Sequence, residues 1–176
     1  LKPAYNVQIA VENYFIVHSY VSNDRTDYNT LIPVLEKHKK AFGEVLEEVT
    51  ADSGYCSEKN LLYLKENQID SYIKLQDHEK RKTRAYSKDI GKYYNMKTTV
   101  FEDEQVYICH DGRELRHINT EKKEQDGYTQ TYEVYGCSDC SGCEHKSKCL
   151  YKYNPDKDID KNKVMKINEV WEELRE

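Results

Sequence analysis

The chain has 176 residues, a length that fits one domain, or one domain carrying a sizeable insertion. It is 34% charged with a net charge of −5, and no apolar run approaches the roughly 20 residues that a membrane-spanning helix needs. This composition is too polar for a membrane protein, and no apolar stretch behind a basic start indicates a signal peptide. We therefore expect a cytoplasmic protein without a membrane partner. Because the chain opens on Leu1 rather than Met, we also expect it to be a piece of a longer protein.

The first 43 residues predict a β-hairpin followed by a helix. Residues 5–11 alternate apolar and polar side chains, and residues 14–21 form a second β-branched and aromatic run, which together are typical of an antiparallel hairpin. Asp27 is a suitable N-cap for a helix whose apolar residues recur at helical spacing, and Gly43 suits its C-terminal end.

The next segment predicts alternation of strands and helices. A strand is expected over residues 45–51, a short helix capped by Ser57 through residue 66, and another strand over 69–75. The resulting order β-β-α-β-α-β favours parallel pairing of the later strands through right-handed crossovers. We therefore expect an α/β fold over residues 1–75.

Beyond residue 75 the pattern becomes β-rich. We expect one strand over 100–109, a turn at 110–113, a return strand over 114–118, a strand over 129–135, a polar connector over 154–163, and a helix starting at Ile167. This predicts three parts: a core over 1–75, a basic linker with a Cys-containing β insertion over 76–163, and over 164–176 the start of a helix that returns to the core.

Residues 80–97 form a basic segment, although the net charge of the whole chain is negative. Residues 76–99 contain seven basic and three acidic side chains, and local fields rather than net charge decide contact with nucleic acid. Lys and Arg interleaved with Tyr can neutralise phosphates and stack on bases, although a solvated linker would have the same composition. The candidate DNA-binding residues are Lys80, Arg81, Lys82, Arg84, Lys88 and Lys92.

Four of the six cysteines fall within one short stretch as Cys137-x2-Cys140-x2-Cys143-x5-Cys149. Close CxxC pairs in a chain without a secretion signal favour metal ligation over disulfides, and this spacing suits a tetrahedral four-thiolate Zn²⁺ site. Reduced or redox-sensitive thiols and an iron–sulfur cluster are the alternatives. His145 or Cys109 could replace one thiolate, whereas Cys56 is interpreted as a small packed residue.

Asp52 follows the strand predicted over 45–51. Open α/β sheets place their chemistry at the carboxyl ends of strands, so Asp52 is a candidate catalytic residue, although an aspartate there can also be only a turn former. The string Ala51-Asp52-Ser53-Gly54-Tyr55 strengthens the catalytic interpretation.

Three segments resemble the DDE-type insertion-sequence transposases, bacterial enzymes with an RNase H-like catalytic domain. They are Lys2–Glu12, the Thr26-Asp27 helix start with Leu31-Ile32-Pro33, and Ala51–Tyr55, which is similar to the motif around the second catalytic acid. The segment Phe101–Gly112 and the Cys137–Cys149 cluster resemble an insertion found in one branch of the family.

The resemblance implies a partial RNase H-like mixed sheet and a metal-dependent reaction on DNA at insertion-sequence ends. In the family two Asp and one Glu hold two divalent ions, usually Mg²⁺, and Asp52 matches the second acid. The first Asp would lie on a strand before Leu1 and the Glu on a helix after Glu176. Glu12, the only candidate stand-in, is interpreted as a hairpin-turn residue, so this chain alone should not cleave DNA.

The first strand of an RNase H-like sheet is central. Without this strand we expect a gap between two pairs of strands. Either another chain fills the gap, or the sheet rearranges to close it. Self-association is therefore possible. The alternatives to a transposase fragment are a non-enzymatic zinc-binding module for DNA or protein, and an iron–sulfur protein.

Overall fold

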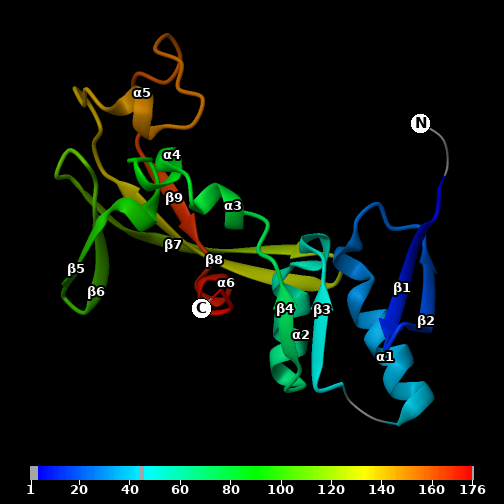
Figure 1. Ribbon diagram of the computed structural model, residues 1–176. Helices are drawn as coiled ribbons and strands as arrows, with labels where there is room; N and C mark the ends of the chain where they lie inside the picture. The colour runs from blue at the N-terminus through cyan, green and yellow to red at the C-terminus, as the bar shows by residue number, and fades with distance from the viewer. Residues whose placement is uncertain (1–3, 44–45, 176) are drawn as a thin grey trace. The chain divides into compact units, whose positions relative to one another are not determined.

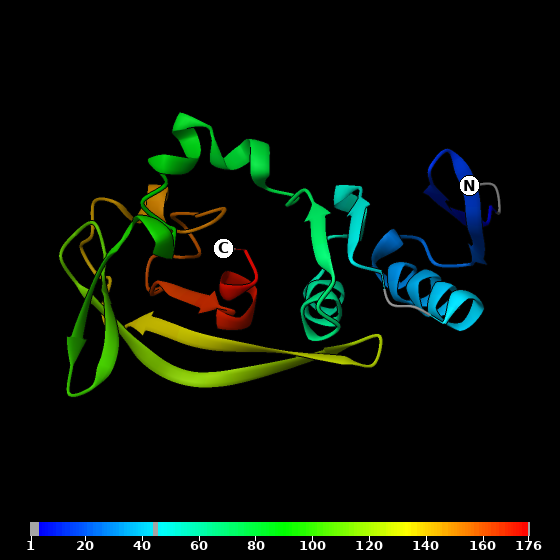
Figure 2. The same cartoon turned by 60° about the horizontal axis from the view of Figure 1, so that its bottom comes forward.

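The computed structural model describes residues 4–43 and 46–175. Two compact units form: unit 1 runs to His78 and also contains the end of the chain from Glu173, and unit 2 comprises Glu79–Glu172. Each unit has its own elements, which Figures 1 and 2 show in chain order. Among the described residues, every helix is too short or too polar to cross a membrane.

Unit 1 begins with the predicted hairpin. Strands β1 (Asn6–Glu12) and β2 (Phe15–Ser22) pair antiparallel, which confirms the expectation from the alternating sequence. The tight turn between them is made by Asn13 and Tyr14, which both adopt a positive φ, at 48° and 69°. Because no glycine is present at this turn, Asn13 and Tyr14 themselves adopt the positive φ, a conformation that residues with a side chain usually disfavour.

The helix after the hairpin starts later than expected. A 3-10 turn spans Asp27–Asn29, and α1 (Leu31–Phe42) begins after Thr30 as its N-cap residue. The prediction of Asp27 as the helix N-cap is therefore wrong, because its carboxylate accepts hydrogen bonds from side chains of β1 instead. Gly43 ends α1 in the left-handed conformation, with φ 74°, as predicted.

The rest of unit 1 is a strand–helix–strand crossover. Strands β3 (Glu48–Ala51) and β4 (Asp70–Ile73) pair parallel through α2 (Glu58–Glu66), which confirms the expected parallel pairing. Ser57 caps α2 as predicted, since its hydroxyl accepts a hydrogen bond from the backbone N–H of Asn60 at 3.3 Å. The predicted start of β3 at Val45 lies outside the described residues.

The core of unit 1 joins the two helices to the parallel strands. Its buried members are Leu31 and Leu35 of α1, Leu64 of α2, and Ile69 before β4. The strands form two separate two-stranded sheets, β1-β2 and β3-β4. This mixed α/β arrangement agrees with a partial RNase H-like fold whose sheet is divided in two.

Unit 2 is built on an antiparallel sheet in the order β5-β6-β7-β8-β9. The longest pair, β7 and β8, runs side by side over its full length (Figure 2). The elements of this part are α3 (His78–Arg81), α4 (Arg84–Ser87), β5 (Lys97–Phe101), β6 (Glu104–Ile108), β7 (Glu114–Gln125), β8 (Tyr128–Cys137), α5 (Lys146–Cys149), β9 (Val164–Ile167) and α6 (Glu169–Glu173).

Two elements of unit 2 differ from the sequence prediction. The single strand expected over 100–109 is a hairpin, because Glu102 and Asp103 turn the chain with positive φ between β5 and β6. The helix expected from Ile167 starts at Glu169, because Ile167 ends β9, which pairs with β8. The turn at 110–113 and its return strand are confirmed, although β7 extends further than expected.

Candidate functional site

Asp52 directly follows β3 and begins the turn that leads into α2. The side chain is exposed, and its Oδ1 accepts hydrogen bonds from the backbone N–H of Gly54 at 3.1 Å and from the hydroxyl of Ser53 at 3.0 Å. These bonds stabilise the ionised carboxylate, the Gly54 bond most, and lower the pKa of Asp52 below its ordinary value. Asp52 therefore presents an exposed, ionised carboxylate, a group whose oxygens can bind a metal ion, at the carboxyl end of a strand.

A polar network connects β1 to the turn after Asp52. The Oδ1 atom of Asp27 accepts hydrogen bonds from the amides of Asn6 at 2.9 Å and Gln8 at 3.0 Å, and the hydroxyl of Tyr55 donates to Gln8 Oε1. A Cβ atom at Gly54 would approach Asp27 Oδ2 to 2.8 Å, so a larger residue at position 54 would require the Asp27 carboxylate to move. The network fixes the backbone that holds Asp52.

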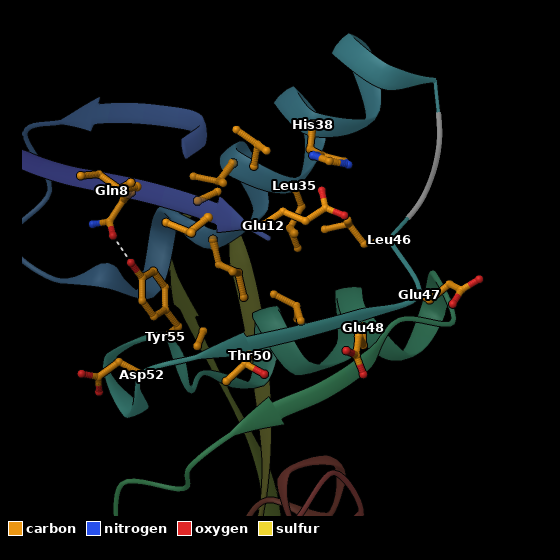
Figure 3. A pocket seen from close by; sticks show the side chains of 18 of the residues that line it. Gln8, Glu12, Leu35, His38, Leu46, Glu47, Glu48, Thr50, Asp52 and Tyr55 are labelled. Atoms are coloured by element: carbon orange, nitrogen blue, oxygen red, sulfur yellow. Dashed lines mark hydrogen bonds between the residues drawn. The ribbon is translucent and has the colours of Figure 1, made fainter. Parts of the chain in front are cut away.

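A cavity of about 890 Å³ lies between the two sheets of unit 1 (Figure 3). Its walls include the consecutive residues 8–12 of β1 and 47–52 at β3, so each strand faces the cavity with its edge rather than with one side-chain face. The other edge of β1 pairs with β2, and that of β3 pairs with β4. Apolar side chains of α1, among them Val34 and Leu35, complete the lining.

The two strands run in opposite directions along this cavity. Figure 3 shows Gln8, Tyr55 and Asp52 at one end, and Glu12 with Glu47 at the other. Glu12 pairs with Phe15 at the closed end of the hairpin. Glu12 therefore lies away from Asp52, as its interpretation as a turn residue requires.

The acids needed for a DDE metal site are not assembled in the described part of the chain. No group of three or more His, Cys, Asp or Glu side chains among the described residues is arranged to hold a metal ion. Asp27 lies across Gly54, but its Oδ1 already accepts two amide N–H groups. The residues present therefore do not by themselves fit a pair of Mg²⁺ ions.

The basic segment forms two short helices and a 3-10 turn in unit 2. Five of the six candidate side chains are exposed, whereas Arg81 is half-buried, with its Nε 3.2 Å from the Tyr86 hydroxyl. The Tyr86 and Tyr94 rings stack with centroids 4.3 Å apart. The cations are therefore accessible to phosphates, while these two rings already stack on each other.

The cysteines of the 137–149 segment converge on a small cavity in unit 2, and Cys109 from the turn after β6 joins them. Leu115 and Leu150 provide apolar walls, and three cationic residues, Arg113, Lys146 and Lys163, also line the cavity. Burial raises the pKa of Cys137 to about 11 and also raises the pKa of Cys149. We call this set of five thiols the thiol cluster.

Cys56 is buried in unit 1, outside the thiol cluster. Burial raises its pKa, so its thiol is protonated at neutral pH, in keeping with the interpretation as a packed residue.

Two parts of these sites, Gln8 and the contact that Asp27 makes with it, were missed from the sequence. Gln8 and Asp27 are about twenty residues apart in the sequence and come into contact only when the chain folds. No spacing of glutamine and aspartate residues in a sequence predicts such a contact. Cys109 was expected as a possible replacement for one thiolate, and the pairing of β6 with β7 and of β7 with β8 brings it to the cluster. A polar residue inside an alternating strand, such as Gln8, is the one signal that was available.

Comparison with known families agrees with these features. A family model described as Transposase DDE domain matches residues 1–138, and a second model with the same description matches residues 108–176. No curated protein and no solved structure matches the chain. Since the first model covers well over half of the chain and includes the Asp52 turn, the chain belongs to the DDE transposase domain family.

Proposed function

We propose that the chain is part of a DDE transposase that performs metal-dependent DNA strand cleavage and transfer for an insertion sequence. Asp52 would be the second catalytic acid. The observation that carries this proposal is the position of an exposed, ionised aspartate at the carboxyl end of β3, beside the open cavity between two unpaired strand edges. Such a strand end is where α/β sheets hold their reactive groups.

The first acid would arrive on a strand that fills this cavity. Because β1 and β3 run in opposite directions along it (Figure 3), an inserted strand antiparallel to β1 would be parallel to β3. Its carboxyl end would then lie next to Asp52, and its inward side chains would pack on Val34 and Leu35 of α1. The insertion would satisfy the free backbone groups of both edges.

The final Glu would also come from outside the 176 residues. With one of three acids present, the chain alone would not hold the metal ions, and we expect it not to cleave DNA. The role left to this chain is to keep Asp52 ionised and oriented through Gly54 and Ser53.

The test is a comparison of full-length enzymes that differ only at Asp52. Asp52→Asn keeps the shape of the side chain and removes its charge, so we expect strand cleavage to fall by at least about 100-fold while folding and DNA binding persist. Asp70→Asn is the matched control, since Asp70 is an exposed aspartate at the opposite end of the paired strand β4. Cleavage by Asp52→Asn at the wild-type rate would show that Asp52 is only a turn residue.

DNA is the partner that this function requires, and the exposed cations of the basic segment, with Arg81, would contact its phosphates. Possible self-association and a cytoplasmic location remain predictions. So does assignment to the branch of the family with a Cys-rich insertion.

A structural Zn²⁺ in unit 2 is the second element of the proposal. The convergence of the cysteines of the 137–149 segment on one cavity supports it. Zinc would hold together a loop region with few apolar residues, whether the chain acts in a transposase or as a binding module. An iron–sulfur cluster would instead give the protein visible colour.

A further inference from the structure

The basic segment packs directly against the end of α5. Gly91, in the middle of the segment, is buried, and a Cβ atom at this position would lie 3.2 Å from the carbonyl carbon of Cys149 and closer still to its oxygen. Both are backbone atoms, so they cannot turn aside as a side chain would. Gly91 is not among the glycines with a positive φ, so the close approach, rather than the backbone conformation, requires a glycine here.

Hydrogen bonds fix both sides of this contact. On the α5 side, Lys163 Nζ donates to the carbonyl oxygen of Cys149 at 3.2 Å. On the other side, the N–H of Gly91 donates to Asp89 Oδ1 at 3.0 Å, and the amide of Asn95 donates to the carbonyl of Asp89, also at 3.0 Å. This Gly91–Cys149 contact therefore joins two parts of unit 2 that are far apart in the sequence and that each have their own hydrogen bonds.

The Gly91–Cys149 contact brings two basic stretches together. Asp89 is the only acidic residue in the basic segment, and residues 145–153 contain three lysines and no acidic residue. One of these lysines, Lys146, is buried and donates to the carbonyl of Ile159, so it is not available to a ligand. The remaining lysines give a positive field on both sides of the contact.

Lys92 and Lys148 are exposed lysines on the two sides of the contact. Lys92 directly follows Gly91, and Lys148 directly precedes Cys149. Because consecutive Cα atoms are about 3.8 Å apart, the Cα atoms of the two lysines lie within about 14 Å of each other across the contact. Neither ammonium group forms an ion pair with another residue that the structure describes. The Lys92 ammonium also lies near enough to that of Lys163 to repel it, and a bound anion would relieve this repulsion.

We propose that Lys92 and Lys148 form one phosphate-binding surface for duplex DNA, held together by the Gly91–Cys149 contact. Lys148 lies outside the basic segment, whose proposed binding of DNA is the basis for this surface. Contacts to phosphates carry no sequence information, so the surface would position the DNA rather than select its sequence. The contact is made by the backbone of Cys149, so the surface would exist whichever thiols bind a metal.

The experiment measures binding of a short DNA duplex of random sequence to the 176-residue protein over a series of NaCl concentrations. The slope of log K against log salt concentration reports the phosphates that the protein neutralises, at about 0.9 per phosphate. We expect Lys148→Gln to reduce this slope by about 1 and the affinity by at least about 3-fold, as Lys92→Gln should. Lys123→Gln is the matched control, since Lys123 is an exposed lysine of β7 in the same unit, and its slope should equal that of the wild type.

The outcomes distinguish failure of this surface from failure of the proposed function. A wild-type slope in Lys148→Gln alone, or an equal loss in Lys123→Gln, would overturn the shared surface and leave DNA contact by the basic segment standing. A wild-type slope in Lys92→Gln, or no binding of DNA by the wild-type chain, would overturn the shared surface together with the proposed contact of Lys92 with DNA.

A second variant tests the Gly91–Cys149 contact without a change of charge. Gly91→Ala adds a methyl group for which the Cys149 backbone leaves no room, so we expect the slope to fall by about 1 or more although no cation is removed. Gly136→Ala is the control, because its methyl group meets chiefly the Cδ1 end of Ile118, an exposed side chain that can move.

Hydrogen exchange of the β7-β8 amides in the same samples shows whether unit 2 remains folded. A folded Gly91→Ala protein with the wild-type slope would overturn the positioning role of the contact. If Gly91→Ala does not fold, Lys148→Gln decides the matter, because its change is confined to an exposed side chain.

Discussion

At the scale of single residues, Asn60 holds together the turns that surround the candidate site. Its side chain is fully buried, and its amide Nδ2 donates to the carbonyl of Tyr28 at 3.0 Å and to that of Tyr55 at 2.8 Å. One side chain of α2 thus joins the 3-10 turn before α1 to the 3-10 turn after Asp52. This contact positions the Asp52 backbone without touching Asp52.

Replacing Asn60 by Asp should destabilise unit 1 strongly. The substitution puts a carboxylate oxygen against two carbonyl oxygens in a buried position, so we expect a loss of about 2–4 kcal/mol in the free energy of unfolding. Asn67→Asp at the end of the same helix, where the side chain is partly exposed and contacts one carbonyl, should cost less than about 1 kcal/mol. Urea unfolding of both variants gives the comparison, and equal costs would contradict the bridging role of Asn60.

We expect Tyr107 to make unit 2 less stable as the pH rises into the alkaline range. Burial, with the neighbouring Tyr135 adding to it, raises the pKa of Tyr107 from its ordinary 10.0 to about 12. Between these values the unfolded chain has released the proton and the folded chain has kept it, so the free energy of unfolding falls as the pH rises. This contribution is fully present below about pH 10 and is lost as the pH rises toward 12.

The Tyr107→Phe variant checks this dependence. Phe has no proton to lose, so the variant should show a smaller fall in stability than the wild type between about pH 10 and the upper limit of the titration. Denaturant unfolding at a series of pH values measures the two slopes. Identical slopes would show that the Tyr107 hydroxyl titrates like that of a free tyrosine.

At the scale of elements, the sequence predicts those whose signals are local. The hairpin, α1, α2 and the parallel pair β3-β4 follow from alternation, helical spacing and caps. Strand β9 was missed because Val164–Ile167 is four residues long and is stabilised by pairing with β8, some thirty residues earlier. The turn at Glu102-Asp103 was missed because no glycine marks it and Glu102 is not a residue that usually adopts a positive φ.

Prediction of the candidate site from the sequence is likewise limited to features with local signals. Asp52 could be proposed as a candidate because it follows a predicted strand and lies in a motif that resembles that of the family. The Asp27–Gln8 network and the place of Cys109 in the cluster depend on contacts between distant segments, which periodicity and spacing do not encode.

The strand-filling proposal predicts a change in hydrogen exchange at two elements. If another strand occupies the cavity in the full-length enzyme, amides at the free edges of β1 and β3 become hydrogen-bonded, and we expect their exchange to slow by about 10-fold or more relative to the 176-residue chain. Amides within the paired β7-β8 hairpin of unit 2 serve as the reference. Equal exchange of the β1 and β3 edge amides in both proteins would contradict occupation of the cavity.

At the scale of the whole molecule, the two units contribute different parts of the proposed activity. Unit 1 contains Asp52 and the cavity between its two sheets, and unit 2 contains the basic segment and the thiol cluster. The net charge of −5 conceals this division, because residues 76–99 carry seven basic and three acidic side chains in a chain that is acidic as a whole.

The central claim is that Asp52 belongs to the catalytic metal site, and mapping that site in the full-length enzyme tests it most directly. Fe²⁺ bound in place of Mg²⁺ generates hydroxyl radicals with peroxide, and these cut the backbone beside the ligands. We predict a cut next to Asp52 that excess Mg²⁺ suppresses and that Asp52→Asn abolishes, while Asp70→Asn retains it. A cut that leaves the Asp52 turn intact, or one that persists unchanged in Asp52→Asn, would contradict the account.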